Sequence, residues 1–313
     1  MKKAQFYLLF IILLLWAKSL HAREQISRNM FMVTNLNTEN GLSSSRVYSI
    51  VEAEDGAMWI STKRGVDRYN GQIVTNYTLA TEMQYSDASG RTIKLLQDCN
   101  RQIYAYDNKG KVYIYNKDQD AFILKYNLLN LLGRSTVLNE LLVDSKGNFW
   151  LALDHGLYWL QASVDEKEIS QEKAKGKYIL KNIYINHIQF VGQKLLVGTS
   201  KDVYQYSLVS LKMEKKLNGF SVVSSYHDRV AHQIWLGTFH QGVLVLDDRT
   251  WKPVSIVDFG SLSKIPQIPV RSIIPYKNDA LLMAVDGAGI YAFDRVSKQT
   301  HLILDTEGVQ VLC

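Results

Sequence analysis

"DGAMWISTKRGVDRYNG", residues Asp55–Gly71, contains an Asp-Gly turn, a tryptophan-bearing strand and a second turn that leads into a tyrosine-bearing strand. Related stretches recur along the chain, and they share a large residue at the position of Trp59. These anchor residues are Trp59, Tyr104, Trp150, Leu196, Trp235 and Leu282, at spacings of 45, 46, 46, 39 and 47 residues. A stretch that recurs at this period indicates architecture rather than a catalytic site.

Each repeat contains four short strands joined by turns. A turn residue follows each anchor by six or seven positions: Gly65, Gly110, Gly156, Asp202, Gly242 and Gly289. Alternating strands such as RVYSIV precede the anchors, and strands such as AFILKY close the units. Four-stranded repeats of about 40–50 residues are typical of propeller blades, so the sequence predicts an all-β fold, a β-propeller.

The repeat count predicts six four-stranded blades plus an incomplete seventh. Six complete units span Leu42 to Asp305, and GVQVLC at 308–313 begins a further inner strand. Met30–Leu36 resembles an outer strand without its blade. Because an open ring exposes sheet edges, we expect residues 23–313 to be a β-propeller sensor domain truncated at its C-terminus, within a longer protein.

Residues 1–22 have the pattern of a secretory signal peptide. Lys2 and Lys3 precede an apolar run from Phe6 to Trp16, and small residues stand near a cut after Ala22. The run is shorter than the roughly 20 residues that span a bilayer, although an uncleaved anchor is the alternative interpretation. Removing this segment lowers the net charge from +6 to +3, and no basic block remains, so we expect no nucleic-acid binding.

The first repeat, NGLSSSRVYSIVEAEDGAMWISTKRGVDRYNG, resembles the two-component-regulator propeller repeat. The resemblance rests on the Gly-Leu-Ser opening, the Asp-Gly turn, the Trp-Ile-x-Thr strand and the Gly-Val-x-Arg-Tyr-x-Gly close. One departure concerns the residue before the Asp-Gly turn. Ala53 stands where the family usually has aspartate, whereas Asp98 and Asp144 match.

The resemblance implies a role in signalling. Such repeats form the periplasmic sensor region of hybrid two-component histidine kinases in gut bacteria that use polysaccharides. The implied partners are an oligosaccharide ligand and the downstream propeller and kinase domains of the same longer protein, with a homodimer as a further expectation. The implied location is the periplasm, with the full-length protein anchored in the inner membrane. Kinase chemistry would lie outside this chain, so we do not expect the chain itself to be an enzyme.

Four arginines and one tryptophan are candidate ligand-binding residues. Arg46, Arg91 and Arg271 lie at or near the starts of inner strands, and Arg64 lies in the loop after the first anchor. Convergent arginines bind the carboxylates or sulfates of acidic sugars, although solvated rim charges are the alternative. Trp159 could stack on a sugar ring, although core packing is the alternative.

The histidines and cysteines give no sign of a metal or redox site. Five histidines after the signal segment lack metal-ligand spacing, and we interpret them as surface or turn residues: His155, His187, His227, His232 and His240. We expect no metal and no cofactor. Cys99 and Cys313 form no motif, and no disulfide is assigned.

Two hypotheses compete with the sensor. An exported propeller enzyme, a lyase or a glycosidase, would need paired acid and base groups, and Asp154-His155 and Asp286 are the nearest candidates. A protein-interaction scaffold would use a propeller face to hold another protein. Turnover of a polysaccharide favours the enzyme, and binding without turnover favours the sensor.

Overall fold

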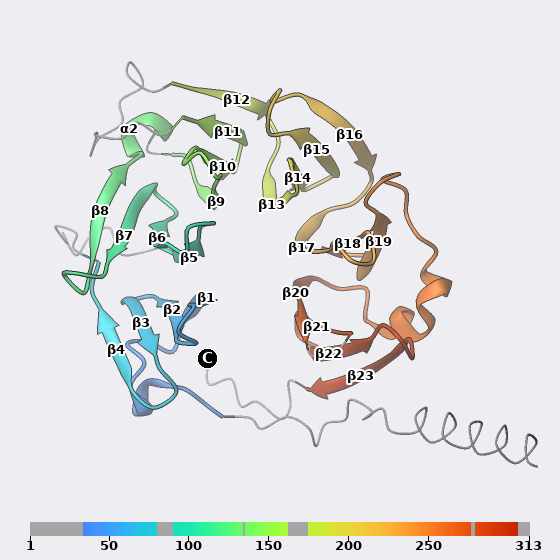
Figure 1. Ribbon diagram of the computed structural model, residues 1–313, viewed down its shortest axis with the longest axis horizontal. Helices are drawn as coiled ribbons and strands as arrows, with labels where there is room; N and C mark the ends of the chain where they lie inside the picture. Colours follow the sequence, from blue (N-terminus) through green and yellow to red (C-terminus); the bar gives the residue numbers. More distant parts are fainter. Residues whose placement is uncertain (1–33, 80–89, 134, 162–174, 277–278, 306–313) are drawn as a thin grey trace, which may run out of the picture.

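The structure is a computed structural model that describes residues 34–79, 90–133, 135–161, 175–276 and 279–305. Its strands form six sheets arranged as the blades of a propeller around a central axis (Figure 1). The all-β propeller predicted from the repeat is therefore confirmed. The predicted signal segment and the predicted strand at 308–313 lie outside the described residues. So does most of the predicted strand at Met30–Leu36, and its described part, residues 34–36, is not in a strand.

The strands of each blade follow one another in sequence order, and every neighbouring pair is antiparallel. The first three blades contain β1 (Val47–Glu52), β2 (Met58–Thr62), β3 (Gly65–Tyr69), β4 (Val74–Tyr77), β5 (Ile93–Gln97), β6 (Ile103–Asp107), β7 (Lys111–Asn116), β8 (Ala121–Asn127), β9 (Leu138–Val143), β10 (Phe149–Leu153), β11 (Gly156–Leu160) and β12 (Gly176–Lys181). The last three contain β13 (Ile185–Val191), β14 (Lys194–Thr199), β15 (Asp202–Ser207), β16 (Met213–Asn218), β17 (Val222–Asp228), β18 (Gln233–Thr238), β19 (Val243–Asp247), β20 (Val270–Tyr276), β21 (Ala280–Val285), β22 (Gly289–Asp294) and β23 (Gln299–Leu304). Three short helices accompany them: η2 (Thr38–Asn40), α2 (Leu129–Leu132) and η4 (Ile256–Lys264).

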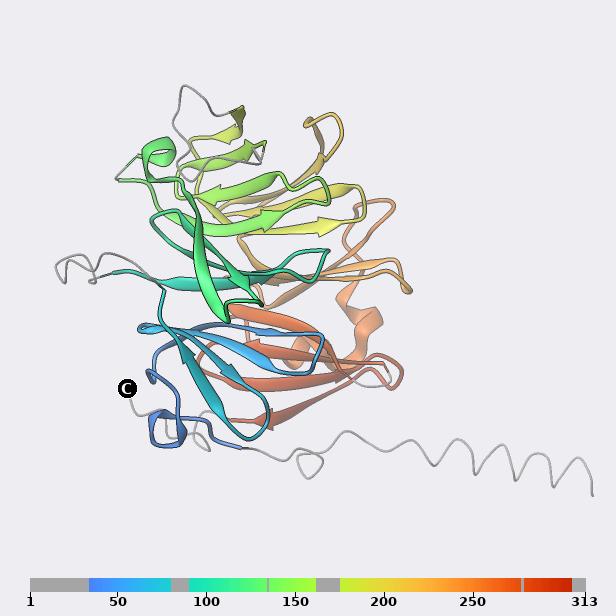
Figure 2. The same ribbon diagram turned by 60° about the vertical axis from the view of Figure 1, so that its left-hand side comes forward.

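The first strand of each blade lies nearest the axis, and successive sheets pack face to face (Figures 1 and 2). The inner strands contact one another in the order β1, β5, β9, β13, β17 and β20. One blade differs from the predicted four strands. Blade five has three, because its fourth position is reduced to a bridge between Leu246 and Pro253, whose ring nitrogen has no proton to donate to a ladder. The helix η4 follows, and its Phe259 and Leu262 pack beside Trp235.

The core lies between the blades. Five apolar clusters each join one blade to the next, and the first five anchors are the large buried residues of these clusters: Trp59, Tyr104, Trp150, Leu196 and Trp235. The prediction that anchors fill the space between blades is thus confirmed for these five. For Leu282 it stays a prediction: like the other anchors it points away from the preceding blade, into which the neighbouring Leu281 and Met283 pack, and no following blade is among the described residues. Strand alternation turns Leu282 to the other face, where it is half-buried.

Glycine begins three of the third strands, β3, β11 and β22, because a side chain would not fit there. A Cβ on Gly65 would collide with the carbonyl oxygen of Tyr77, and one on Gly289 with that of Leu304. Both residues also have positive φ, of 154° and 99°. In these three blades the turn glycine is therefore a packing requirement.

Candidate functional site

One position on the inner strand carries a polar residue in every blade. In each ladder it pairs with the residue two positions after the anchor, and the series is Ser49, Lys94, Glu140, His187, Ser224 and Ser272. A β-bulge precedes this residue in all blades but the second. A bulge bends its strand and redirects the side chain that follows, here toward the adjoining blade.

Five of these six residues bond to the inner strand of the next blade. The contacts are Ser49 Oγ accepting from Leu95 N–H (2.8 Å), Lys94 Nζ donating to Asn139 O (2.8 Å), Glu140 Oε2 accepting from Ile188 N–H (2.8 Å), His187 Nε2 with Ser225 Oγ (2.8 Å) and Ser224 Oγ donating to Val270 O (2.6 Å). We call this set the inner staples. Ser272 has no hydrogen-bond partner among the described residues. The inner staples join consecutive blades along the ring's inner edge.

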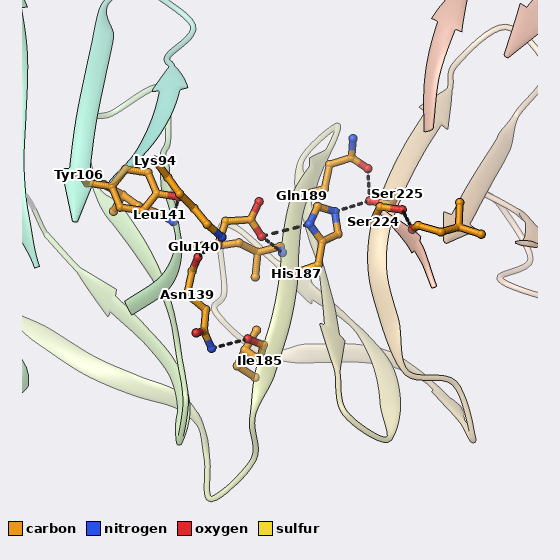
Figure 3. A network of polar contacts seen from close by, with 12 residues as sticks. Lys94, Tyr106, Asn139, Glu140, Leu141, Ile185, His187, Gln189, Ser224 and Ser225 are labelled. Atoms are coloured by element: carbon orange, nitrogen blue, oxygen red, sulfur yellow. Dashed lines mark hydrogen bonds and ion pairs between the residues drawn. The ribbon is translucent and has the colours of Figure 1, made fainter. Parts of the chain in front are cut away.

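A polar network lies across blades three, four and five (Figure 3). His187 Nδ1 lies 3.0 Å from Glu140 Oε2, and His187 Nε2 lies 2.8 Å from Ser225 Oγ. Ser225 Oγ donates to Gln189 Oε1 at 2.5 Å. A carboxylate, an imidazole and a serine hydroxyl thus stand in the order of a Ser-His-acid triad.

The hydrogen bonds run against nucleophilic activation at Ser225. The single Ser225 proton is directed at Gln189 Oε1, so Ser225 does not donate it to His187 Nε2 as a nucleophile activated by a histidine base would. Acyl transfer also needs N–H donors at an oxyanion position, and the nearby Ile188 N–H is already bonded to Glu140. The contacts of Glu140 and His187 serve as inner staples, the role that Ser49 and Ser224 have at the same ladder position in blades one and five.

The Glu140 carboxyl is held as a carboxylate. Its partial burial raises the pKa, but the His187 imidazole, the Ile188 N–H and the Lys94 ammonium together outweigh burial, so the pKa lies below its ordinary value. The Glu140 side chain is 25% exposed and that of His187 is 15% exposed, so water screens the pair only partly. This inner staple is the one that joins an acidic side chain to the next blade.

The four candidate arginines lie at the same face of the ring, where inner strands begin and second strands end. Lys63 N–H bonds to Arg46 O across this edge, and Arg91 and Arg271 reach the ends of the second strands of their own blades. Arg91 Nε is 3.0 Å from Asp107, and Arg271 Nη2 is 2.7 Å from Asp286. Arg46 and Arg64 are exposed, without a side-chain partner among the described residues. Two of the four are therefore already paired with carboxylates.

The predicted stacking residue Trp159 packs against the core cluster between blades three and four, beside Trp150. Its exposure is intermediate, so the alternative of core packing describes its position better. Cys99 is an exposed free thiol.

The interpretation of the histidines as surface or turn residues is wrong for two of them. His187 and His227 lie within inner strands, with side chains 15% and 12% exposed, and His227 Nε2 contacts Asp248 at 2.9 Å. His155 lies in a turn between Asp154 and Tyr178, at 2.7 Å from each. Within the described ranges, no three His, Cys, Asp or Glu side chains are arranged to hold a metal ion.

These features define a β-propeller with inner-edge staples, and the comparisons place its first repeat more narrowly. Residues 41–64 match the family described as two component regulator propeller, so the resemblance seen in the first repeat is confirmed. No curated protein matches the chain. Within the described part of the chain, no helix has the length and apolar character to cross a membrane.

Three solved structures show how far the fold is shared. The extracellular domain of BT3049 of B. thetaiotaomicron, described as a hybrid two-component system, is 18% identical to this chain, with a TM-score of 0.63. The matched region covers 86% of this chain and 36% of the BT3049 chain. A chain of the mitotic checkpoint complex is 9% identical, with a TM-score of 0.63. The matched region covers 92% of this chain and 88% of that one. PorZ of Porphyromonas gingivalis, a component of the type-IX secretion system, is 10% identical, with a TM-score of 0.59. The matched region covers 79% of this chain and 38% of PorZ. At such identities the likeness shows the fold alone.

Proposed function

We propose that this protein is an exported, ligand-binding propeller of a two-component signalling system and that it responds to glycans. The observation that carries the proposal is the family match at residues 41–64, which falls on the first blade of the propeller. The likeness to the extracellular domain of BT3049 agrees with this proposal. Because the chain spans 36% of that domain, the activity and partners of a whole signalling protein are part of the proposal.

The location and partners follow from the same proposal. Residues 1–22 would direct export to the periplasm, and a further propeller, a membrane anchor and a histidine kinase would be covalent partners in a longer protein. Signal transfer would require a ligand that binds one arrangement of the propeller more tightly than another. An oligosaccharide released from a complex polysaccharide fits an exported module of this family.

Calorimetry with the purified exported protein tests the proposal. We expect one class of oligosaccharide, from a panel of plant and host polysaccharides, to bind without release of new reducing ends. Cleavage of any member would instead favour the exported lyase or glycosidase. Failure of every glycan to bind, together with stable binding of a protein partner, would favour a scaffold.

A hydrolase is the second candidate, and the contacts among Glu140, His187 and Ser225 are the observation that favours it. A fluorophosphonate probe labels serines that are activated as nucleophiles. We expect no labelling, because the Ser225 hydroxyl is bonded to Gln189 and its neighbours serve as inner staples. Labelling that disappears in Ser225→Ala would establish the hydrolase.

A further inference from the structure

A groove of about 490 Å³ lies between blades one and two, at the ends of strands β1 and β7. It is on the face opposite to the candidate arginines, because β1 begins beside Arg46 and ends beside Ala53. Its walls include Ala53, Trp59, Arg68, Arg101, Tyr115 and Lys117. Arg101 and Lys117 are exposed, so the groove opens to solvent.

A second groove, between blades five and six, has a similar volume of about 520 Å³ and the same construction. Asp228 is equivalent to Ala53. Each stands on its inner strand two positions after the residue that pairs with the tryptophan anchor in the ladder. Arg295 is likewise equivalent to Lys117. Each stands three positions after the third-strand residue that pairs with its blade's anchor, Leu282 or Tyr104. In this second groove the Asp228 carboxylate, 3% exposed, forms an ion pair with Arg295.

An aspartate at this position is bonded in other blades too. Asp98 accepts from the hydroxyl of its anchor Tyr104 at 3.3 Å, and Asp144 accepts from Nε1 of its anchor Trp150 at 3.4 Å. Blade one differs from blades two, three and five at this position, because Ala53 supplies no acceptor. The anion is missing while the groups that would bind it are kept.

Three donors in the first groove lack an acceptor among the described residues: Trp59 Nε1, the Arg101 guanidinium and the Lys117 ammonium. Nε1 of Trp235, the equivalent anchor in the second groove, is buried and has no hydrogen-bond partner among the described residues, so an unpaired anchor N–H is common to both grooves. Two acidic residues, Glu54 and Asp55, also line the groove. Asp55 is engaged, because its carboxylate accepts from Ala57 N–H and pairs with Arg68, which lies over the Trp59 ring.

We propose that this groove binds the carboxylate of an acidic sugar, in the place that the aspartate side chain holds in blades two, three and five. The choice of a sugar rests on the function proposed above. Lys117 and Arg101 supply the charge, Trp59 Nε1 supplies an N–H, and Tyr115 supplies a ring at the wall. The volume lies within the range of small-molecule sites.

The sharpest test restores the missing aspartate. Ala53→Asp should fold, because aspartate occupies the same position in three other blades. Its carboxylate should form an ion pair with Lys117. The probe is trigalacturonate, with its methyl ester as the uncharged counterpart, measured by calorimetry. We expect Ala53→Asp and Lys117→Gln each to weaken trigalacturonate binding at least tenfold. We expect Ala53→Asn, which adds the same bulk without the charge, to stay within about threefold of the parent.

The outcomes separate this site from the proposed function. Equal losses in Ala53→Asp and Ala53→Asn, or equal affinities for the acid and its methyl ester, would overturn the carboxylate assignment. Unchanged affinity in all variants would overturn the groove while leaving glycan binding intact. Failure of the parent protein to bind trigalacturonate would also overturn the groove, whereas failure to bind any glycan would overturn the proposed function itself. Binding of a short acidic peptide in place of the sugar would assign the groove to a protein partner.

Discussion

The junction of blades one and two and the junction of blades five and six are built to one plan, with one exchange between them. Each has a buried tryptophan anchor, Trp59 or Trp235, and an inner staple from a serine, Ser49 or Ser224. Each has an outer groove of about 500 Å³. At the exchanged position, Asp228 pairs with Arg295, whereas Ala53 leaves Lys117 unpaired. The repeat thus determines the packing of both junctions. The exchange of aspartate for Ala53 leaves Lys117 available for the proposed ligand.

The largest effect should come from truncating the anchor. We expect Trp235→Ala to lower the free energy of unfolding by about 3–5 kcal/mol, because its ring is fully buried against Phe259 and Phe293. Trp59→Ala should cost a similar amount, because Tyr115 and Phe122 surround Trp59 in the same way. Denaturant titration of both variants measures this.

If the two junctions are equivalent, the two losses should agree within about 1 kcal/mol, the spread expected for one type of core truncation. Trp159→Ala is the matched control, since that tryptophan is only half-buried and should cost less. A negligible loss in either anchor variant would show that the junctions differ in packing as well as in charge.

The next effect concerns the exchanged position. Asp228→Ala should lower the free energy of unfolding by about 3 kcal/mol, because it leaves Arg295 without its buried carboxylate. It also removes the acceptor of the Val230 and Ala231 N–H groups. Ala53→Asp should change stability in the opposite direction, by about 1 kcal/mol, since Lys117 is exposed and its ion pair would be screened. Paired denaturation curves at low and high salt measure both.

Arg271→Gln is the control for Asp228→Ala, because the Arg271–Asp286 pair is about half exposed and should contribute little. A loss in Arg271→Gln as large as that in Asp228→Ala would mean that burial does not set the value of these ion pairs.

The sequence predicted the blades well, because period, turn glycines and anchors are properties of one repeat. It missed the inner staples, although a polar residue stands ten positions before Trp59, Tyr104, Trp150 and Leu282. Residue type varies along that series from serine to lysine, glutamate and histidine, and the offset is nine before Leu196 and eleven before Trp235. A pattern of chemistry without a fixed residue or offset is hard to separate from ordinary strand alternation.

The candidate site shows the same limit. Arg46, Arg91 and Arg271 lie at or near the starts of inner strands, as expected. The carboxylates that bind Arg91 and Arg271 lie across a ladder, 16 and 15 residues further along the chain. The absence of aspartate at position 53 was visible in the sequence. The counterpart Lys117 was not, because it comes from the next blade and is recognised only by register.

The last effect tests the inner edge, where the two compared junctions use serine and the junction of blades three and four uses Glu140. Because the pKa of Glu140 is lowered in the folded protein, its contribution to stability is complete above the ordinary value of 4.5 and is lost as pH falls through the folded value. Glu140→Gln should therefore cost about 1.5–3 kcal/mol at pH 7, the range for a hydrogen bond to a charged group, and less at pH 3. Urea titrations across this interval measure the difference, with Glu52→Gln, an exposed carboxyl on β1, as the control. A Glu140→Gln loss that stayed constant with pH would show that the charge of this inner staple contributes nothing, and that all three junctions are held by neutral hydrogen bonds.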